Sequence, residues 1–263
     1  MLILLSPAKS LDYATPIPRL SATLPRLLDE SERLVEVMRG KSVAELAALA
    51  DISDELAALN AQRWAEFSLP FTPRNSRPAV LAFDGDVYRG IDARRRFGTR
   101  DYTEAQKTVR ILSGLYGVLR PLDLIQPYRL EMGTRVATVR GDSLYDWWGT
   151  AVTDLLKADL GEAPGAEVVI NLASNEYFGA VQSSRLGVPV ISPRFEDTNA
   201  SGRRSVVSFY AKRARGEMAA WLVVNRVRTA SALKRFDVAG YRYDKASSSS
   251  EVPVFVRSFT DRC

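Results

Sequence analysis

Arginine, glycine, proline and tyrosine crowd together in residues 109–133, which read VRILSGLYGVLRPLDLIQPYRLEMG. A guanidinium group can hold a phosphate through two hydrogen bonds, and glycine lets a backbone approach a ligand closely. The run supplies three candidate phosphate contacts and one candidate wall residue, namely Arg110, Arg120 and Arg129, and Tyr116. The pattern predicts one side of an anion-binding cleft.

A second candidate segment follows the first apolar run of the chain. Residues 6–13 read SPAKSLDY, and a loop at the carboxyl end of a strand commonly holds ligands. Lys9 is the expected anion contact, and Ser6 and Tyr13 are expected to line the cleft. The segment lacks the glycines and the spacing of a P-loop. A purely structural loop is the alternative interpretation.

Two further loops place polar groups at predicted strand ends, in residues 83–88 (FDGDVY) and 170–177 (INLASNEY). Their candidate cleft-lining residues are Tyr88, Asn171 and Ser174. The carboxylates of Asp84 and Asp86 could hold a hard cation or cap the next element, and capping is the favoured interpretation. For Ser174 the favoured role is that of a helix N-cap.

A fifth segment, residues 208–218 (SFYAKRARGEM), enters a predicted helix with three cations and two aromatic rings. The cations are candidate phosphate contacts, namely Lys212, Arg213 and Arg215. Phe209 and Tyr210 offer flat surfaces on which nucleic-acid bases can stack. A basic helix end that is merely exposed to water explains the same pattern equally well.

The composition excludes several classes of site. The 263 residues contain no histidine, which removes Ser-His and Cys-His nucleophiles and the zinc sites built on imidazole. The one cysteine, Cys263, has no partner for a disulfide or a metal. We therefore expect no bound metal and no cofactor. The apolar start, Met1–Leu5, is too short for a signal peptide or a membrane span, so we expect a cytoplasmic protein without a membrane partner.

Charge is distributed unevenly along the chain, although the net charge is only +5. Residues 203–245 carry eleven bases and three acids, a balance of +8. Residues 29–60 carry eight acids and three bases, a balance of −5. A basic face and an acidic face are expected, and the basic face suits a polyanion that approaches from one side.

Hydrophobic periodicity and turn residues predict interspersed strands and helices. Expected strands are 1–5, 78–83, 167–172 and 188–191, and a closing hairpin is expected from 238–243 and 252–259. Expected helices begin near Leu27, at Ser42 with a capping box to Glu45, at Ser53, at Thr103, at Ser143 and at Ala211. The sequence predicts one mixed α/β domain over residues 1–263, with a central sheet surrounded by helices.

Together these segments resemble the YaaA family of bacterial peroxide stress proteins. The matching stretches are SPAKSLDY, GDVYRG, RILSGLYGVLRPLDLIQPYRLEMG, INLASNEY and SFYAKRARGEM. Ser10 stands where the family more often has threonine, which keeps the hydroxyl. The resemblance implies a YaaA-like α/β fold, DNA binding, and a cytoplasmic role in limiting free iron and oxidative DNA damage during peroxide stress.

The resemblance also implies a helix-hairpin-helix element, for which residues 42–67 are the candidate. Such hairpins use glycine amides to approach phosphate. Here Asp51 and Ser53 replace both glycines, and Asp54 and Glu55 add negative charge. The basic surface is therefore expected to supply most of the affinity, and an ordinary corner between two helices is the alternative.

The leading hypothesis is a non-enzymatic protein that binds the phosphate backbone of duplex or branched DNA in a basic cleft. The rival is a histidine-free enzyme that acts on a nucleotide or nucleic acid, with Asp12, Glu131 or Glu176 as acid or base. Direct storage of iron is a third, weaker hypothesis, because no carboxylate cluster is evident in the sequence. The sequence makes no prediction of the oligomeric state.

Overall fold

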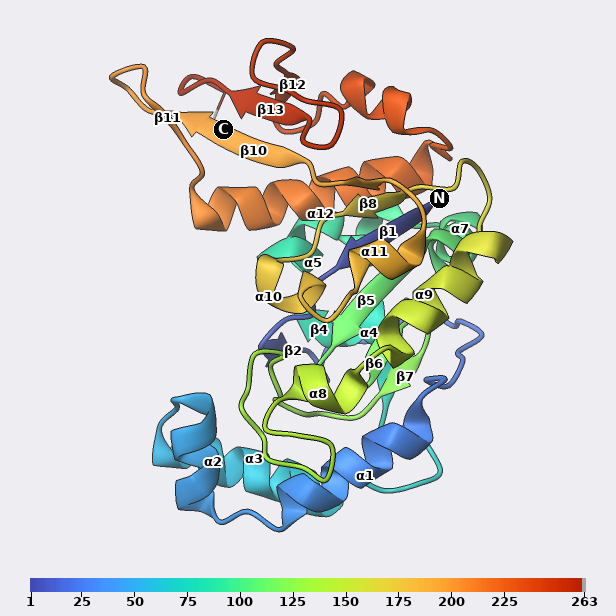
Figure 1. Cartoon of the computed structure of the whole chain (residues 1–263), viewed down its shortest axis with the longest axis vertical. Helices are drawn as coiled ribbons and strands as arrows, with labels where there is room; N and C mark the ends of the chain where they lie inside the picture. Colours follow the sequence, from blue (N-terminus) through green and yellow to red (C-terminus); the bar gives the residue numbers. More distant parts are fainter. Residues whose placement is uncertain (262–263) are drawn as a thin grey trace.

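Five strands form a mixed sheet at the centre of the computed structural model, which describes residues 1–261 (Figure 1). Their order is β6-β5-β1-β8-β9. β1 pairs in parallel with β5 and β8, β8 pairs in parallel with β9, and β6 runs antiparallel to β5. The strands are β1 (Leu2–Leu5), β5 (Val109–Ser113), β6 (Gly117–Leu119), β8 (Val169–Asn171) and β9 (Val190–Ile191). The predicted α/β fold with a central sheet is confirmed.

The central strand β1 determines where the polar loops gather. All four of its residues are apolar and buried, as expected of a parallel strand covered on both faces. Leu4 of β1 pairs with Asn171 of β8, so both strands end at the same edge of the sheet. The segments that follow them, residues 6–10 and 172–177, are therefore neighbours.

Helices flank the sheet (Figure 1). They are α4 (Ala79–Ala82), α5 (Asp86–Ile91), α6 (Ala93–Arg96), α7 (Thr99–Thr108), α8 (Leu144–Trp148), α9 (Ala151–Glu162), α10 (Asn175–Phe178), α11 (Ser183–Leu186) and α12 (Ser208–Val224). Ser143 caps α8 as predicted, but the helix ends at Gly149, whose φ is +49°, and α9 starts separately. The buried apolar side chains form one hydrophobic core.

Two local predictions are wrong. Residues 78–83 were expected as one strand, but α4 occupies the middle of this run, between the short strands β3 (Arg77–Pro78) and β4 (Phe83–Asp84). A short, fully buried apolar run does not distinguish a strand from a helix turn. β3 pairs with β7 (Leu124–Ile125), and β4 pairs with β2 (Ser10–Leu11).

The helix expected to start at Thr103 begins earlier. Its first residue is Thr99, because the backbone N–H of Gly98 donates to the carboxylate of Asp101 at 2.9 Å and closes the helix start there. The chain leaves the helix after Thr108 and continues as β5. The segment 109–133 is therefore strand and turn, with its glycine turns between buried strands.

A second sheet, in the order β11-β10-β13-β12, lies at the C-terminal end of the molecule. Its strands are β10 (Arg194–Thr198), β11 (Arg204–Ser205), β12 (Arg242–Tyr243) and β13 (Val254–Arg257), with the 3-10 helix η1 (Ala230–Arg235) before β12. The predicted closing hairpin is present as antiparallel β12 and β13. β10 was not predicted, because its buried Glu196 and Asp197 interrupt the apolar pattern. Arg257 and Tyr241 satisfy Asp197 at 2.7 and 2.8 Å.

Three helices form the opposite, N-terminal end of the molecule (Figure 1). They are α1 (Leu28–Arg39), α2 (Val43–Ala50) and α3 (Asp54–Glu66). The predicted capping box of Ser42 and Glu45 and the predicted N-cap Ser53 are both present. α2 and α3 are joined by a short turn in which Asp51 takes a left-handed conformation. The structure thus contains a helix pair at residues 42–67, while its use as a DNA-binding hairpin stays a prediction.

The two charged segments lie at opposite ends of the molecule. The acidic residues 29–60 belong to α1, α2 and α3, and the basic residues 203–245 belong to α12, η1, β11 and β12. Among the helices of residues 1–261, no span is both long enough and apolar enough to cross a membrane.

Candidate functional site

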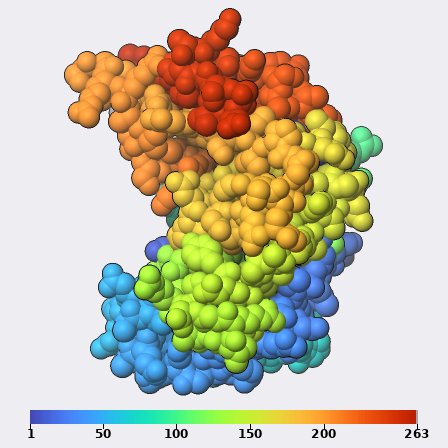
Figure 2. All heavy atoms as spheres, viewed as in Figure 1, coloured from blue at the N-terminus to red at the C-terminus, as the bar shows by residue number. Residues whose placement is uncertain are grey.

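A cavity of about 560 Å³ lies at the carboxyl ends of β1 and β8. Figure 2 shows the molecule hollowed on one side, between the orange C-terminal part and the blue N-terminal helices. Five segments contribute to the cavity wall: residues 6–10, 84–89 and 172–177, Glu131 of the run 109–133, and the start of α12. Its charged and polar lining includes Ser6, Lys9, Asp84, Asp86, Tyr88, Arg89, Glu131, Ser174, Glu176, Tyr177, Lys212 and Arg215. Five of the sequence motifs therefore meet in one place.

Hydrogen bonds fix the loops at the floor of the cavity. The backbone N–H of Ser174 donates to Ser6 Oγ at 2.8 Å, and this hydroxyl in turn donates to Ser174 Oγ at 3.3 Å. Ser174 also caps α10, as predicted, by accepting from the Tyr177 N–H at 3.5 Å. Tyr88 donates its hydroxyl to the Ser6 carbonyl at 3.0 Å, and burial raises the pKa of this phenol well above its usual value. Two serines thus link the segments after β1 and β8, and a neutral phenol attaches α5 to the first of them.

Two glycines allow α12 to lie directly against α5. A Cβ added at Gly216 of α12 would overlap the Val87 carbonyl, and one added at Gly90 of α5 would overlap the Arg213 carbonyl. The helices are therefore in backbone contact, closer than any side chain permits. This contact places Lys212 and Arg215 beside residues 84–89, which include the first turn of α5.

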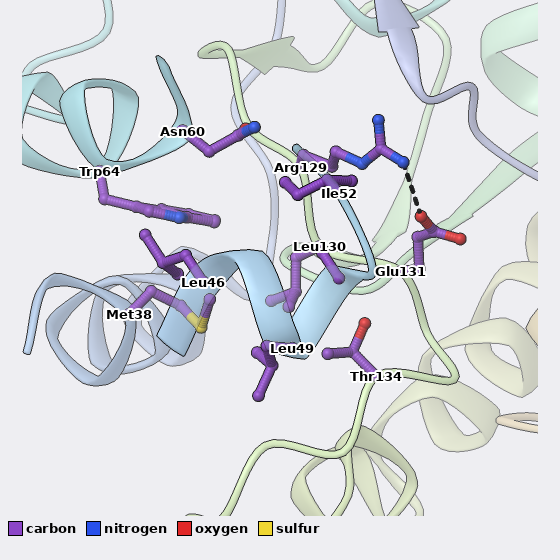
Figure 3. Close-up of a pocket in the computed structure, with 11 residues that line it drawn as sticks. Met38, Leu46, Leu49, Ile52, Asn60, Trp64, Arg129, Leu130, Glu131 and Thr134 are labelled. Carbon is purple, nitrogen blue, oxygen red and sulfur yellow. Dashed lines mark hydrogen bonds and ion pairs between the residues drawn. The ribbon is translucent and has the colours of Figure 1, made fainter. Parts of the chain in front are cut away.

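A chain of ion pairs crosses from the cavity toward the N-terminal helices. Lys9 Nζ lies 2.8 Å from Glu131 Oε2, and Arg129 Nη2 lies 3.4 Å from Glu131 Oε1. Figure 3 shows Arg129 extending beside Ile52, in the turn between α2 and α3, with its guanidinium toward Glu131. Arg129 thus faces a narrow, mainly apolar crevice and not the main cavity, although its partner Glu131 lines both.

Arg215 is the cation with the clearest capacity for a ligand. It is half-buried in the cavity wall, and burial lowers the pKa of its guanidinium. Among residues 1–261, none forms an ion pair or a hydrogen bond with it. Because arginine keeps its charge at neutral pH, an anion in the cavity would satisfy this group.

Four of the seven predicted phosphate contacts do not line the cavity, and two of them, Arg110 and Arg120, are bound to internal aspartates. Arg110 is buried in the core, where its Nε binds Asp159 and its Nη1 binds the carbonyls of Gln106 and Val109. Arg120 donates to the buried carboxylate of Asp123 at 2.9 and 3.1 Å. Both arginines neutralise an internal aspartate, so we assign them a structural role and leave them out of the binding surface.

Arg213 is exposed on α12 but faces a different groove from Lys212 and Arg215. Its Nε lies 3.9 Å from Glu217, and the neighbouring lining includes Phe209 and Tyr210. The two predicted stacking rings therefore accompany Arg213 outside the cavity. Phe209 is half-exposed there.

Three predicted lining residues serve the scaffold. Tyr13 donates its hydroxyl to the Ile125 carbonyl at 2.5 Å, and the fully buried Tyr116 accepts from the Gln126 N–H at 3.1 Å. Asn171 shapes the turn after β8 by accepting from the Ala173 N–H at 3.0 Å. Asp12, a candidate acid or base, accepts from the N–H groups of Ala14 and Thr15 and pairs with Arg94 at 3.0 Å.

The aspartates of residues 83–88 differ from expectation in detail. The N-cap of α5 is Gly85, and no side chain of residues 1–261 caps that helix. Asp84 instead pairs with Arg89 at 3.1 Å, while Asp86 stands in the first turn of α5, where the helix dipole favours a carboxylate. Arg89 and Tyr177 line the cavity and were not singled out, although both stand in the motifs GDVYRG and INLASNEY. Arg89 directly follows Tyr88, and Tyr177 directly follows Glu176, and this adjacency to candidate site residues is the sequence feature that could have predicted them.

The metal-ligating residue types do not cluster. Within residues 1–261, no group of three or more aspartate, glutamate or cysteine side chains is arranged to hold a metal ion.

Comparison with known proteins gives one consistent result. Residues 1–247 match the family model described as peroxide stress protein YaaA. A UPF0246 protein of Idiomarina loihiensis is 50% identical over 258 residues, which cover 98% of this chain and 99% of that protein. A UPF0246 protein of Cupriavidus metallidurans is 52% identical and covers 99% of this chain and 100% of its own length. This chain therefore belongs to the YaaA family of peroxide stress proteins.

Proposed function

We propose that this peroxide stress protein binds the phosphate backbone of duplex or branched DNA with cations around the rim of the cavity. The observation that carries the proposal is the meeting of Lys9 with Lys212 and Arg215 at one cavity. Arg213 extends this cationic surface along α12, and its side chain is 58% exposed. Phosphate contacts of this kind supply most of the sequence-independent affinity of DNA-binding proteins.

The cations that form this surface are accessible to a large anion. Lys9 is 62% exposed even though it pairs with Glu131, and an exposed ion pair contributes little energy, so a phosphate can compete for the ammonium. The surrounding C-terminal end carries the excess of basic residues at 203–245. This excess favours the approach of DNA from that side.

The helix pair α2–α3 is a poor phosphate contact by comparison. Residues 42–67 carry five acids, Glu45, Asp51, Asp54, Glu55 and Glu66, against the single base Arg63. Asp51, Asp54 and Glu55 are exposed around the turn between the helices. We therefore assign the backbone contacts to the rim of the cavity and not to this turn.

The family resemblance supports two further parts of the proposal. The first part is that the protein acts in the cytoplasm. The second is that its DNA binding helps limit intracellular free iron and damage to DNA during peroxide stress.

Salt dependence tests the proposed backbone contacts. We expect the Lys212→Ala variant to bind a mixed-sequence duplex more weakly than the unaltered protein. The magnitude of its slope of log affinity against log salt should be smaller by about 0.9, the value for one lost phosphate contact. Lys157→Ala, an exposed lysine on α9, is the matched control and should leave the slope unchanged. Fluorescence anisotropy over a salt series measures both. Absence of duplex binding by the unaltered protein, or affinity that does not change with salt, contradicts the proposal.

A further inference from the structure

The cavity wall carries both basic and acidic side chains, and binding of a phosphate backbone alone would account only for the basic ones. Its lining contains four basic side chains, Lys9, Arg89, Lys212 and Arg215, and four carboxylates, Asp84, Asp86, Glu131 and Glu176. The carboxylates would repel a polyanion that filled the cavity. A matching ligand must therefore offer negative charge at one end and hydrogen-bond donors at the other.

The cationic end is built on α12. Arg215 is half-buried and has no ion-pair or hydrogen-bond partner within residues 1–261, and Lys212 stands one helix turn before it on the same side. Neither cation is neutralised by the nearby protein carboxylates that form ion pairs. This pair suits a phosphate group.

The acceptor end is built on α10, the short helix that follows β8. Glu176 Oε1 accepts the backbone N–H of Gly133 at 3.0 Å, which fixes the orientation of the carboxylate. Its other oxygen, Oε2, accepts no hydrogen bond from the described residues 1–261. Glu131 is occupied by Lys9 and Arg129, so Glu176 is the carboxylate in the cavity wall with an unused acceptor beside a fixed backbone contact.

The size and position of the cavity indicate a small molecule or a single residue of a polymer. A volume of about 560 Å³ falls within the range of small-ligand pockets. The carboxyl edge of a parallel sheet is also the usual location of such pockets in α/β proteins. At the floor, a Ser174–Ser6 hydrogen bond joins the segments that follow β1 and β8, and the Tyr88 hydroxyl ties α5 to the Ser6 carbonyl.

We propose that the cavity binds one nucleoside phosphate, with Arg215 and Lys212 at the phosphate and Glu176 accepting hydrogen bonds from the sugar hydroxyl or the amino group of the base. Two sources share this chemistry: a free mononucleotide, and an unpaired nucleotide of a DNA strand held at the rim. The second source rests on the DNA binding proposed above, and the first does not.

Isothermal titration calorimetry with the four 2′-deoxynucleoside 5′-monophosphates tests the proposal, with the corresponding nucleosides as phosphate-free probes. At least one nucleotide should bind, and its nucleoside should bind much more weakly. Arg215→Met should lower the nucleotide affinity about 10- to 100-fold, because it removes charge-assisted hydrogen bonds. Arg100→Met, an exposed arginine on α7 outside the cavity, is the control and should have no effect.

Glu176→Gln tests the acceptor end separately. The amide oxygen can still accept the Gly133 N–H, but the second position becomes a donor, so nucleotide and nucleoside affinities should fall together by about 10-fold. If Arg215→Met does not fold, as judged by circular dichroism, Arg215→Lys replaces it and should give an intermediate loss. The proposal is overturned if none of the four nucleotides binds, if nucleosides bind equally well, or if both Arg215 variants bind like the unaltered protein.

A duplex with one unpaired 2-aminopurine distinguishes the two sources. A nucleotide of the strand that enters the cavity should change its fluorescence on binding, and Glu176→Gln and free mononucleotide should both suppress the change. An unchanged signal together with mononucleotide binding assigns the cavity to free nucleotides. A fully paired duplex is titrated in parallel: duplex binding without any nucleotide binding defeats this inference alone, and nucleotide binding without duplex binding defeats the proposed DNA function alone.

Discussion

Replacing Asp159 by alanine is expected to lower the free energy of unfolding by about 3–5 kcal/mol, the usual cost of removing one partner from a buried charge network. Asp159 of α9 is 4% exposed and binds two arginines. Arg26 donates to both of its oxygens, and Arg110 donates from the core side. The variant would leave the buried Arg110 and the half-buried Arg26 without a counter-charge. Urea unfolding monitored by tryptophan fluorescence measures the loss.

Asp154→Ala is the matched control for this variant. Asp154 lies on the same helix and pairs with Arg185 at 3.1 Å, but both side chains are about half exposed. Removing such a pair should leave the unfolding free energy essentially unchanged. Equal losses in the two variants would contradict the role assigned to Asp159.

The same network gives a pH dependence whose sign follows from its chemistry. Burial alone would raise the pKa of Asp159, but hydrogen bonds from Arg26 and Arg110 outweigh burial and hold the pKa below its ordinary value. The stabilisation is therefore complete above the ordinary carboxyl pKa and is lost as pH falls through the lower pKa of the folded protein. The difference in stability between the unaltered protein and Asp159→Ala should shrink in that acidic range.

Gly216→Ala is expected to destabilise the protein by at least about 2 kcal/mol, opposite in sign to the usual effect of this substitution within a helix. An added methyl group would overlap the Val87 carbonyl, which belongs to the backbone of α5 and cannot rotate away. α12 would have to move from α5, taking Lys212 and Arg215 from the cavity. Duplex affinity should therefore fall together with the thermal unfolding temperature.

Gly161→Ala is the control for the stabilisation that alanine gives over glycine through its higher helix propensity. Gly161 lies in α9, and an added Cβ would meet no atom within 4 Å. This substitution should be neutral or should stabilise the protein by up to about 1 kcal/mol. If both alanine variants stabilise the protein, the close contact of α5 and α12 is not a constraint.

The fold could be predicted from the sequence to the extent that local signals agreed with tertiary packing. The apolar run of β1 and the capping residues Ser42, Ser53 and Ser143 gave correct element starts, because each acts through its immediate neighbours. β10 was not predicted because it buries the charged Asp197. Arg257, sixty positions away in the sequence, balances that charge only in the folded chain. Residues 78–83 were predicted as a strand because a short, fully buried apolar run has the same pattern in a strand and in a helical turn.

The candidate site was predictable in its segments and less so in its individual side chains. Lys9, Ser174 and Arg215 follow strand ends or enter a helix, and the sheet topology brings these points together. Arg110 and Arg120 are equally suited to phosphate by sequence. In the structure, Arg110 pairs with Asp159, which is distant in the sequence, and Arg120 pairs with Asp123 within a turn. A single sequence shows that an arginine is present and not whether a carboxylate has already neutralised it.

Hydrogen exchange of the 263-residue chain, with and without duplex DNA, most directly tests where the phosphate backbone lies. Binding at the rim predicts slower exchange in residues 6–10, 84–89 and 208–216, and unchanged exchange in residues 42–67. Protection confined to residues 42–67 would place the DNA on the α2–α3 turn and contradict binding by Lys9 and the cations of α12.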